Sequence, residues 1–350
     1  MKFAFRVDSS YQIGSGHLMR CLTLAKALKD KKIESIFISI KNKGDMSFLL
    51  KKHNFKILNI NNKKIDKKFF SSWKTDAEDT LKKIKDEKIT HLIADHYEID
   101  ENWEKYLYKH LKKIIVMDDL ANRKHFCDIL LDYSLPVKDY SKLVPLHTEI
   151  LSGPKFALLD KSFLKERKKT KQEKKISKNK DFNFYVSFGA SDFTQETKKT
   201  LIALKKLEKN LCFKANIIVG KNNKQKKDIK KFCSKEDNFF YYEQPEKVAP
   251  IMSKSNFGIG SPGTTTWERC CMGLPSILIS VADNQIEIGK ACNKLKIANY
   301  IGDSKNISSD DLKVLISEMS KNPKKMFEYK EAGLKLIDGF GASRVLSKII

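Results

Sequence analysis

The sequence predicts an α/β protein built from two similar domains that face each other across a cleft. Short apolar strands alternate with stretches of helical periodicity along the 350 residues, and such alternation is typical of parallel sheets covered by helices. A polar stretch at residues 160–181 separates two series of this kind. The apolar content of 41% is enough for two cores of ordinary size.

The first series predicts a domain over residues 1–159. After its first strand, apolar side chains recur at intervals of three and four residues, which predicts one buried face of a helix. These residues are Leu18, Cys21, Leu22, Ala25 and Leu28. The strands expected in this domain are Phe3–Asp8, Ser35–Ile40, Lys56–Ile60, His91–Asp95, Ile114–Asp118 and Ile129–Asp132.

The polar stretch at residues 160–181 is dominated by Lys, Glu, Ser and Asn. Because it cannot bury enough apolar surface to offset the entropy of ordering, we expect a helix end followed by an exposed linker. A second domain is predicted over residues 182–335, and residues 336–350 are expected to form a C-terminal helix that packs back on the first domain. The strands expected in the second domain are Phe184–Phe188, Asn216–Gly220, Phe239–Tyr242, Phe257–Gly260 and Ser276–Val281.

The composition argues against several classes of protein. No run approaches the roughly eighteen uncharged apolar residues of a membrane span, and the N-terminal segment meets charged residues too early for a signal peptide. We therefore expect a cytoplasmic protein with no membrane partner. The net charge of +25 comes mostly from lysines spread along the whole chain, which indicates a solvated surface rather than a nucleic-acid site.

The seven cysteines are predicted to be buried free thiols. Their number is odd, the chain has no Cys-x-x-Cys pair, and Cys270 and Cys271 are adjacent, which is poor geometry for a disulfide. The sequence also has no His, Cys and Asp cluster with the spacing of a zinc site. We expect a monomer that uses neither a metal nor a cofactor.

A glycine-rich turn, Ile13-Gly14-Ser15-Gly16-His17, lies between the first strand and the first helix. Its two glycines allow a sharp turn and a close approach to a ligand, and the helix start directs free N–H groups towards that ligand. The positive end of the helix dipole disfavours the imidazolium, so we expect His17 to be the neutral imidazole that a general base requires. The alternative is a histidine that only caps the helix beside a tight turn.

A second candidate loop covers residues 260–268, Gly-Ser-Pro-Gly-Thr-Thr-Thr-Trp-Glu, between a strand and a helix. Gly263 and the hydroxyl residues Thr264 and Thr265 supply flexible backbone and capping oxygens at a helix start, which suits a pyrophosphate. Glu268 falls about one turn into the helix, where its carboxylate can accept two hydrogen bonds from a ribose diol. The alternative is that Glu268 only complements the helix dipole.

Three further loops follow strands and are expected to contact a ligand through their small or polar residues. Their candidate residues are Gly189, Ser191 and Asp192 at the phosphates, Tyr97 in Asp95-His96-Tyr97 facing the sugar, and the amides Asn284 and Gln285. Each loop alone is more typical of local capping, and Asp118-Asp119 is ambiguous for the same reason. All five candidate loops lie on the same side of their sheets, at the carboxyl ends of strands, where ligands bind in such folds.

Four motifs together point to a known family. They are Arg6-x-Asp8-x-Ser10-x-x-Ile13-Gly14-x-Gly16-His17-x-x-Arg20-Cys21-Leu22, Asp118-Asp119-x-x-x-Arg123-x-His125-x-Cys127-Asp128, Gly263-Thr-x-Thr-Trp-Glu268-Arg-Cys-x-x-Gly-x-Pro275 and Asp338-Gly339-x-Gly341-Ala342-x-Arg344-Val345. In combination they resemble the UDP-2,4-diacetamido-2,4,6-trideoxy-β-L-altropyranose hydrolases of pseudaminic acid biosynthesis, and the similarity spans nearly the whole chain.

This resemblance implies a GT-B fold of two Rossmann-like domains, like that of the glycosyltransferase MurG, with UDP held mainly by the second domain. It also implies metal-free hydrolysis in which His17 activates water for inversion at the anomeric carbon. Three alternatives stay open. A glycosyltransferase of the same fold would use His17 to deprotonate an acceptor alcohol, a hydrolysing UDP-sugar 2-epimerase would need further carboxylates near the sugar, and a non-catalytic nucleotide or RNA binder would be indifferent to loss of His17.

Overall fold

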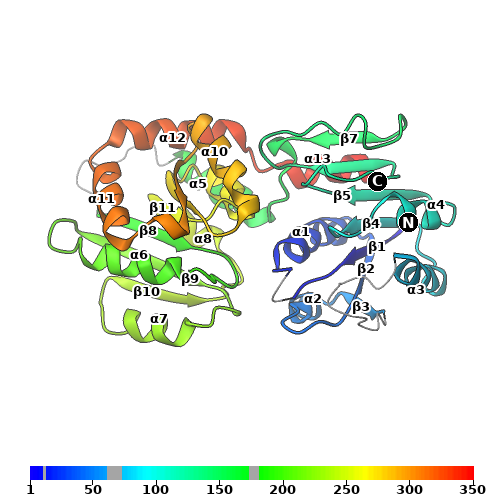
Figure 1. Ribbon diagram of the computed structural model, residues 1–350, viewed down its shortest axis with the longest axis horizontal. Helices are drawn as coiled ribbons and strands as arrows, with labels where there is room; N and C mark the ends of the chain where they lie inside the picture. The colour runs from blue at the N-terminus through cyan, green and yellow to red at the C-terminus, as the bar shows by residue number, and fades with distance from the viewer. Residues whose placement is uncertain (11–12, 61–72, 173–180) are drawn as a thin grey trace. The chain divides into compact units, whose positions relative to one another are not determined.

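The computed structural model describes residues 1–10, 13–60, 73–172 and 181–350 and divides into two compact units (Figure 1). Unit 1 consists of Met1–Leu158 and Phe340–Ile350, and unit 2 consists of Leu159–Gly339. Each unit is a parallel sheet flanked by helices, which confirms the predicted fold class. The cleft expected between the two domains stays a prediction.

The strands of unit 1 are β1 (Lys2–Val7), β2 (Glu34–Ser39), β3 (Lys56–Asn59), β4 (His91–Asp95), β5 (Lys113–Met117), β6 (Ile129–Asp132) and β7 (Glu149–Ser152). They form a seven-stranded parallel sheet in the order β3-β2-β1-β4-β5-β6-β7. The strands β2 and β3 lie on one side of β1, and the strands β4–β7 lie on its other side. The strand order therefore reverses between β1 and β4. Ligands of open α/β sheets bind at such a switch point, beyond the carboxyl ends of the strands.

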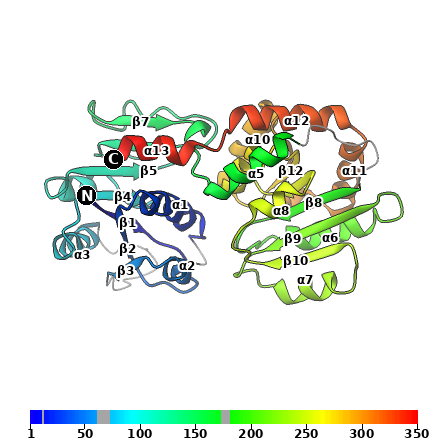
Figure 2. The same ribbon diagram turned by 180° about the vertical axis from the view of Figure 1, so that it is seen from behind.

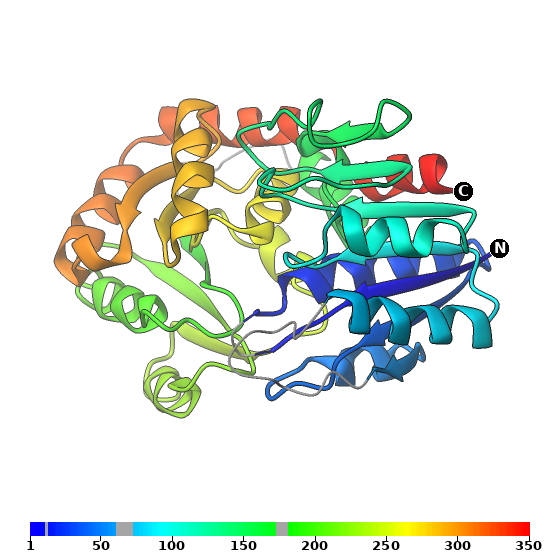
Figure 3. The ribbon, with the colours of Figure 1, turned by 45° about the vertical axis from the view of Figure 1, so that its right-hand side comes forward.

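The helices of unit 1 are α1 (Gly16–Asp30), α2 (Ser47–Lys52), α3 (Trp73–Asp86), α4 (Glu101–Tyr108) and α13 (Gly341–Ile349), with a 3₁₀ turn η1 (Pro154–Phe156). They cover both faces of the sheet because side chains alternate along its strands. Ala4 of β1 belongs to the core beneath α3 and α4, which lie side by side in Figure 3, whereas Phe5 lies on the opposite face and stacks on Phe37. The C-terminal helix α13 packs against α1 (Figure 2).

The strands of unit 2 are β8 (Phe182–Ser187), β9 (Phe213–Val219), β10 (Phe239–Glu243), β11 (Phe257–Gly260), β12 (Ser276–Ser280) and β13 (Asn299–Asp303). Their parallel sheet has the order β10-β9-β8-β11-β12-β13, so it reverses between β8 and β11. Unit 2 therefore repeats the arrangement of unit 1. The loops that follow β8 and β11 carry the candidate residues at 189–192 and 263–268.

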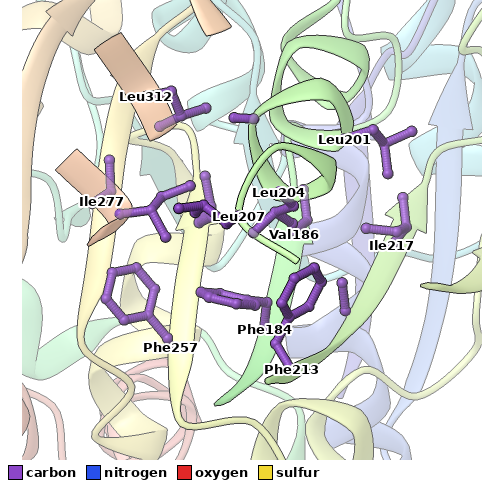
Figure 4. Close-up of a cluster of buried hydrophobic side chains, with 14 of the residues drawn as sticks. Phe184, Val186, Leu201, Leu204, Leu207, Phe213, Ile217, Phe257, Ile277 and Leu312 are labelled. Carbon is purple, nitrogen blue, oxygen red and sulfur yellow. The ribbon is translucent and has the colours of Figure 1, made fainter. Parts of the chain in front are cut away.

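The helices of unit 2 are α5 (Lys161–Gln172), α6 (Glu196–Lys205), α7 (Lys226–Cys233), α8 (Ala249–Ser253), α9 (Thr264–Met272), α10 (Ile286–Lys294), α11 (Ser309–Ser320) and α12 (Pro323–Leu336), with the 3₁₀ turns η2 (Asp283–Gln285) and η3 (Ser304–Asn306). One core lies between the sheet and α6, α7, α11 and α12, with Phe184 of β8 in contact with the ring of Phe257 (Figure 4). Phe257 and Ile259 of β11 belong to this core, so Gly258 and Gly260 face the other side of the sheet.

The two edge strands β7 and β13 were not expected from the sequence. Only Leu151 is buried in β7, and every residue of β13 is half-buried, so neither strand shows the apolar run of a central strand. The expectation of buried thiols is wrong for Cys212, which is exposed just before β9, whereas the other six cysteines are buried.

The polar stretch at residues 160–181 was expected to be a helix end followed by an exposed linker. Its first half forms α5, and the side chains of Phe163 and Arg167 are buried in unit 2. The guanidinium of Arg167 donates to the backbone oxygens of Cys271, Leu334 and Ile337, which lets a charged helix be buried on one side. Residues 173–180 lie outside the described part of the chain. Within the described ranges, no helix is both long and apolar enough to cross a membrane.

Candidate active site

The turn before α1 places His17 in the first turn of that helix. Gly14 has a φ of +79°, a conformation that favours glycine, and its N–H donates to the backbone oxygen of Ser10 at 2.9 Å. α1 then begins at Gly16, its cap residue Ser15 makes no side-chain bond to the described helix, and its first turn contains no acidic residue. The start of α1 is thus a positive helix end with no carboxylate of its own.

Asp95 lies beside this turn because β4 is the parallel neighbour of β1 across the switch point, where Val7 pairs with Asp95. Asp95 Oδ1 lies 2.5 Å from His17 Nδ1, and the Asp95 side chain is completely buried. An ionised carboxylate has no proton to donate, so Nδ1 carries the hydrogen and the lone pair of the neutral ring is on Nε2. The pair therefore presents a base at His17 Nε2.

Arg20 holds the Asp95 carboxylate from the same face of α1 as His17. Its Nε donates to Asp95 Oδ2 and its Nη2 donates to Asp95 Oδ1, both at 2.6 Å. Burial alone would raise the pKa of Asp95, but the neighbouring Arg20 and His17 hold it well below its ordinary value. Asp95 is therefore ionised at neutral pH. Arg20 Nη2 and His17 Nδ1 lie 3.1 Å apart because both donate to the same oxygen, Asp95 Oδ1.

Asp119 and Tyr97 complete the cluster around His17. Arg20 Nη1 donates to Asp119 Oδ2 at 2.9 Å. The ring of Tyr97 lies edge-on to the imidazole of His17 with 4.5 Å between the centroids, and 36% of Tyr97 is exposed. Burial, together with Asp119, raises the pKa of Tyr97 well above its ordinary value, so its hydroxyl is a protonated donor at neutral pH.

Two nearby carboxylates instead stabilise the framework. Asp8 at the end of β1 forms a buried ion pair with Arg6, whose Nη1 lies 2.8 Å from Asp8 Oδ1. Asp118 accepts a hydrogen bond from the backbone N–H of Ala121 at 2.8 Å, which is the local capping role left open by the sequence. Of the pair Asp118-Asp119, only Asp119 contacts the His17 cluster through Arg20.

In unit 2, β11 ends at Gly260 and α9 begins at Thr264, with Gly263 as its cap residue. Gly263 has no side chain with which to cap the helix, and the first turn of α9 contains no acidic residue. Thr264 is exposed and Thr265 half-buried, whereas Thr266 is buried and its Oγ1 accepts from the N–H of Gly263 at 3.2 Å. The turn therefore offers backbone N–H groups and two hydroxyl groups to an anion.

The N-terminus of α6 differs because the chain neutralises it from within. Asp192 accepts from the backbone N–H of Glu196 at 2.9 Å and of Thr197 at 3.0 Å, one on each carboxylate oxygen. Both carboxylate oxygens of Asp192 therefore cap α6, and its expected place at the phosphates stays a prediction. Gly189, which is exposed at a φ of +84°, and the half-buried Ser191 are the remaining candidates of this loop.

The amides after β12 lie one strand further from the switch point than the loops after β8 and β11. Gln285 Oε1 accepts from the backbone N–H of Val281 at 3.0 Å, so part of this amide is used within its own loop. Asn284 is exposed in η2. The loops at 189–192 and 263–268 thus follow the neighbouring strands β8 and β11, whereas Asn284 and Gln285 follow β12.

Glu268 lies in the second turn of α9 and is half-buried. Burial raises its pKa to about 7, while Arg269 opposes the shift and Asp160 adds to it. The carboxyl group therefore titrates near neutral pH. In the parts of the chain that the structure describes, no group of three or more His, Cys, Asp or Glu side chains could hold a metal ion.

Asp95 and Arg20 contact each other in the cluster around His17, but neither was among the candidate site residues. The sequence indicated the loop Asp95-His96-Tyr97 only for its place facing the sugar, and Arg20 only as part of a motif. The available signal was the spacing of His17 and Arg20, which puts both on one helix face, together with an aspartate at the end of a buried strand.

Comparison with known proteins supports the predicted resemblance. Residues 186–338 match the glycosyltransferase family 28 C-terminal domain. Over 261 residues the chain is 28% identical to the UDP-2,4-diacetamido-2,4,6-trideoxy-β-L-altropyranose hydrolase of Campylobacter jejuni, with 73% of this chain and 83% of that protein covered. The resemblance is confirmed. An uncharacterised protein of Methanocaldococcus jannaschii is 26% identical over 286 residues, which are 80% of this chain and 55% of that protein, so the chain spans about half of its length.

Among solved structures, MurG of Acinetobacter baumannii superposes with a TM-score of 0.70 at 13% identity, with 99% of both chains covered. At this identity the similarity establishes the fold alone. The chain therefore has the GT-B-type architecture of two Rossmann-like units.

Proposed function

We propose that this chain is a hydrolase that releases UDP from a UDP-linked 2,4-diacetamido-2,4,6-trideoxy sugar, a step of pseudaminic acid biosynthesis. The observation that carries the proposal is the hydrogen-bonded pair of His17 and Asp95 at the switch point of unit 1. The similarity to the hydrolase of Campylobacter jejuni supports the substrate class.

His17 is the proposed general base. Its Nε2 accepts a proton from water while the water oxygen bonds to the anomeric carbon, and the bond from that carbon to the diphosphate oxygen breaks with its electrons leaving on UDP. The imidazolium that forms lies beside Asp95, which stabilises the new charge, and Arg20 keeps Asp95 ionised and in place. Direct displacement by water inverts the anomeric configuration.

Other residues around His17 are proposed to shape the sugar side of the site. The turn Gly14–Gly16 has no side-chain bulk at its two glycines, so a ligand can approach the backbone closely. Tyr97, of which 36% is exposed, keeps its hydroxyl group protonated beside Asp119 and is proposed to line the sugar side of the site.

The N-terminus of α9 is the proposed diphosphate site. Its glycine cap leaves backbone N–H groups to stabilise the leaving group, and Thr264 and Thr265 add hydroxyl donors. Glu268, one turn further along, is the proposed acceptor for the ribose hydroxyls. Gly189 and Ser191 follow the neighbouring strand β8 and are proposed to line the phosphates. The leaving group is then stabilised without a metal ion.

A glycosyltransferase is the second candidate, because residues 186–338 match a domain named for a glycosyltransferase family. In that case His17 would deprotonate an acceptor alcohol instead of water. The two functions differ in whether UDP is released when no acceptor is present.

The proposed function is tested by incubating the chain with a panel of UDP-sugars, without an acceptor, and following UDP release by NMR. The proposal predicts faster release from the UDP-linked 2,4-diacetamido sugar than from UDP-N-acetylglucosamine. His17→Asn should lower kcat by about 100-fold or more with little change in KM. Absence of UDP release from every sugar would contradict the proposal, and so would retention of more than about a tenth of the turnover by His17→Asn.

A further inference from the structure

Arg269 is a buried arginine beneath the turn that opens α9. It is 2% exposed, and its side chain lies against the face of β11 that carries Gly258 and Gly260. A Cβ at Gly260 would lie 2.6 Å from Arg269 Nη1, and a Cβ at Gly258 would lie 3.1 Å from Arg269 Cδ. Glycine weakens a strand interior, but two glycines at alternate positions make room here for a whole guanidinium group.

The hydrogen bonds of Arg269 connect it to the turn. Its Nη2 donates to the backbone oxygen of Ser261 at 2.8 Å and to Thr266 Oγ1 at 3.1 Å. Thr266 Oγ1 also accepts from the backbone N–H of Gly263 at 3.2 Å. One side chain therefore braces both ends of the turn Ser261–Thr266.

The charge of Arg269 has no carboxylate partner among the residues that the structure describes. There its Nε and Nη1 are buried without a hydrogen bond. Burial lowers the pKa of Arg269, whereas for the buried Arg6 and Arg20 the effect of burial is outweighed by carboxylates that raise the pKa. Arginine keeps its proton at neutral pH even so. The neighbouring Glu268 has a pKa of about 7 and makes no ion pair with Arg269, so the positive charge under the start of α9 is only partly compensated.

We propose that Arg269 is a positioning residue for the diphosphate of the substrate. It holds the turn Ser261–Thr266 in the shape that receives an anion, and its charge is balanced when the diphosphate binds. This inference rests on the proposed function, because it takes the start of α9 as the diphosphate site. A buried, unpaired charge destabilises a fold unless a partner balances it, and a bound anion supplies that partner.

The effect of Arg269 should depend on the charge of the ligand. The experiment is calorimetric titration with UDP and with uridine, which shares the base and ribose of UDP but carries no phosphate. Arg269→Met keeps an unbranched apolar stem and removes the guanidinium with its charge, so UDP affinity should fall by about tenfold and uridine affinity by less than about twofold. Arg269→Lys keeps the charge and should retain UDP affinity to within about threefold.

Arg167 provides the matched control, since it is a buried arginine of the same unit whose guanidinium donates to backbone oxygens away from this turn. Arg167→Met should lower the melting temperature and leave the ratio of UDP to uridine affinity unchanged. Should Arg269→Met fail to fold, as judged by circular dichroism, Thr266→Val removes the oxygen that links Arg269 to Gly263. The same ratio should then fall by about threefold or more.

Two results would overturn the inference on Arg269. One is an unchanged UDP affinity in the folded variant, and the other is an equal loss of UDP and uridine affinity. If the wild-type chain binds UDP no better than uridine, the diphosphate site at α9 is contradicted, and with it the nucleotide placement in the proposed function.

Discussion

Asp95→Asn removes the negative charge beside His17 while keeping the size of the side chain. Arg20 occupies both carboxylate oxygens of Asp95 at 2.6 Å, so an amide at this position must turn its NH₂ group towards one of two donors. In one orientation the NH₂ faces His17 Nδ1, which then accepts a hydrogen bond and leaves the ring proton on Nε2. In the other orientation the NH₂ faces the N–H of Arg20 Nε.

Both orientations impair the proposed base. The first removes the lone pair from Nε2, and the second keeps the tautomer but loses the charge that stabilises the imidazolium. We expect kcat to fall about 10³-fold, which corresponds to about 4 kcal/mol of activation free energy, with KM changed by less than about threefold. The free energy of unfolding should fall by about 2–3 kcal/mol, because Arg20 keeps its second partner Asp119.

The assay is UDP release by the purified variant, with stability measured by urea denaturation. Asp76→Asn is the matched control, because Asp76 is also buried and accepts from Arg6 at 2.7 and 3.1 Å in a separate ion pair. It should lose comparable stability and keep kcat within about fivefold. The proposed role of Asp95 is refuted if folded Asp95→Asn keeps more than about a tenth of kcat, or if Asp76→Asn loses as much turnover as Asp95→Asn.

Four further predictions concern the nucleotide, the pH and metal ions. Glu268→Gln should weaken UDP binding by about ten- to hundred-fold in calorimetric titration, whereas unchanged affinity would move the nucleotide towards the Gly189–Asp192 loop. Since the pKa of Glu268 is about 7 and its ionised form is the proposed acceptor, uridine binding should strengthen with rising pH across neutrality and stay flat in Glu268→Gln. The pKa of Asp95 is lower in the folded chain than its ordinary value, so the ionised carboxylate stabilises the fold above the unfolded pKa of about 4. This stabilisation is lost as the pH falls further. The free energy of unfolding of Asp95→Asn should therefore depend less steeply on pH in that acidic range. Turnover should be unchanged in excess EDTA, and a loss that magnesium or manganese restores would contradict a metal-free reaction.

The sequence predicted the central strands and the place of His17 at a helix start because their signals are local. The run Phe257–Gly260 is apolar and bounded by polar residues, and the glycines around Ser15 mark a turn at a helix start. The contact of Asp95 with His17 could not be predicted in the same way. It depends on the pairing of β1 with β4, which are far apart in the sequence, and on the register that sets Val7 opposite Asp95.

The loops of unit 2 show the same limit. A carboxylate after a strand has one sequence pattern whether it contacts a ligand or caps the next helix, and only the folded backbone of α6 shows that Asp192 caps it. An arginine within a helix ordinarily indicates a solvated surface. The burial of Arg269 follows from the alternation of β11, which turns Gly258 and Gly260 towards α9 and leaves room for the guanidinium.

In the proposed reaction, water activated by His17 attacks the anomeric carbon and releases UDP. The most direct measurement is a single turnover in water labelled with oxygen-18, followed by mass spectrometry of both products and NMR of the freshly released sugar. The proposed mechanism predicts that the label appears in the anomeric hydroxyl of the sugar, that UDP carries none, and that the anomeric configuration is inverted. Label in the phosphate of UDP, or a released sugar of retained configuration, would contradict it.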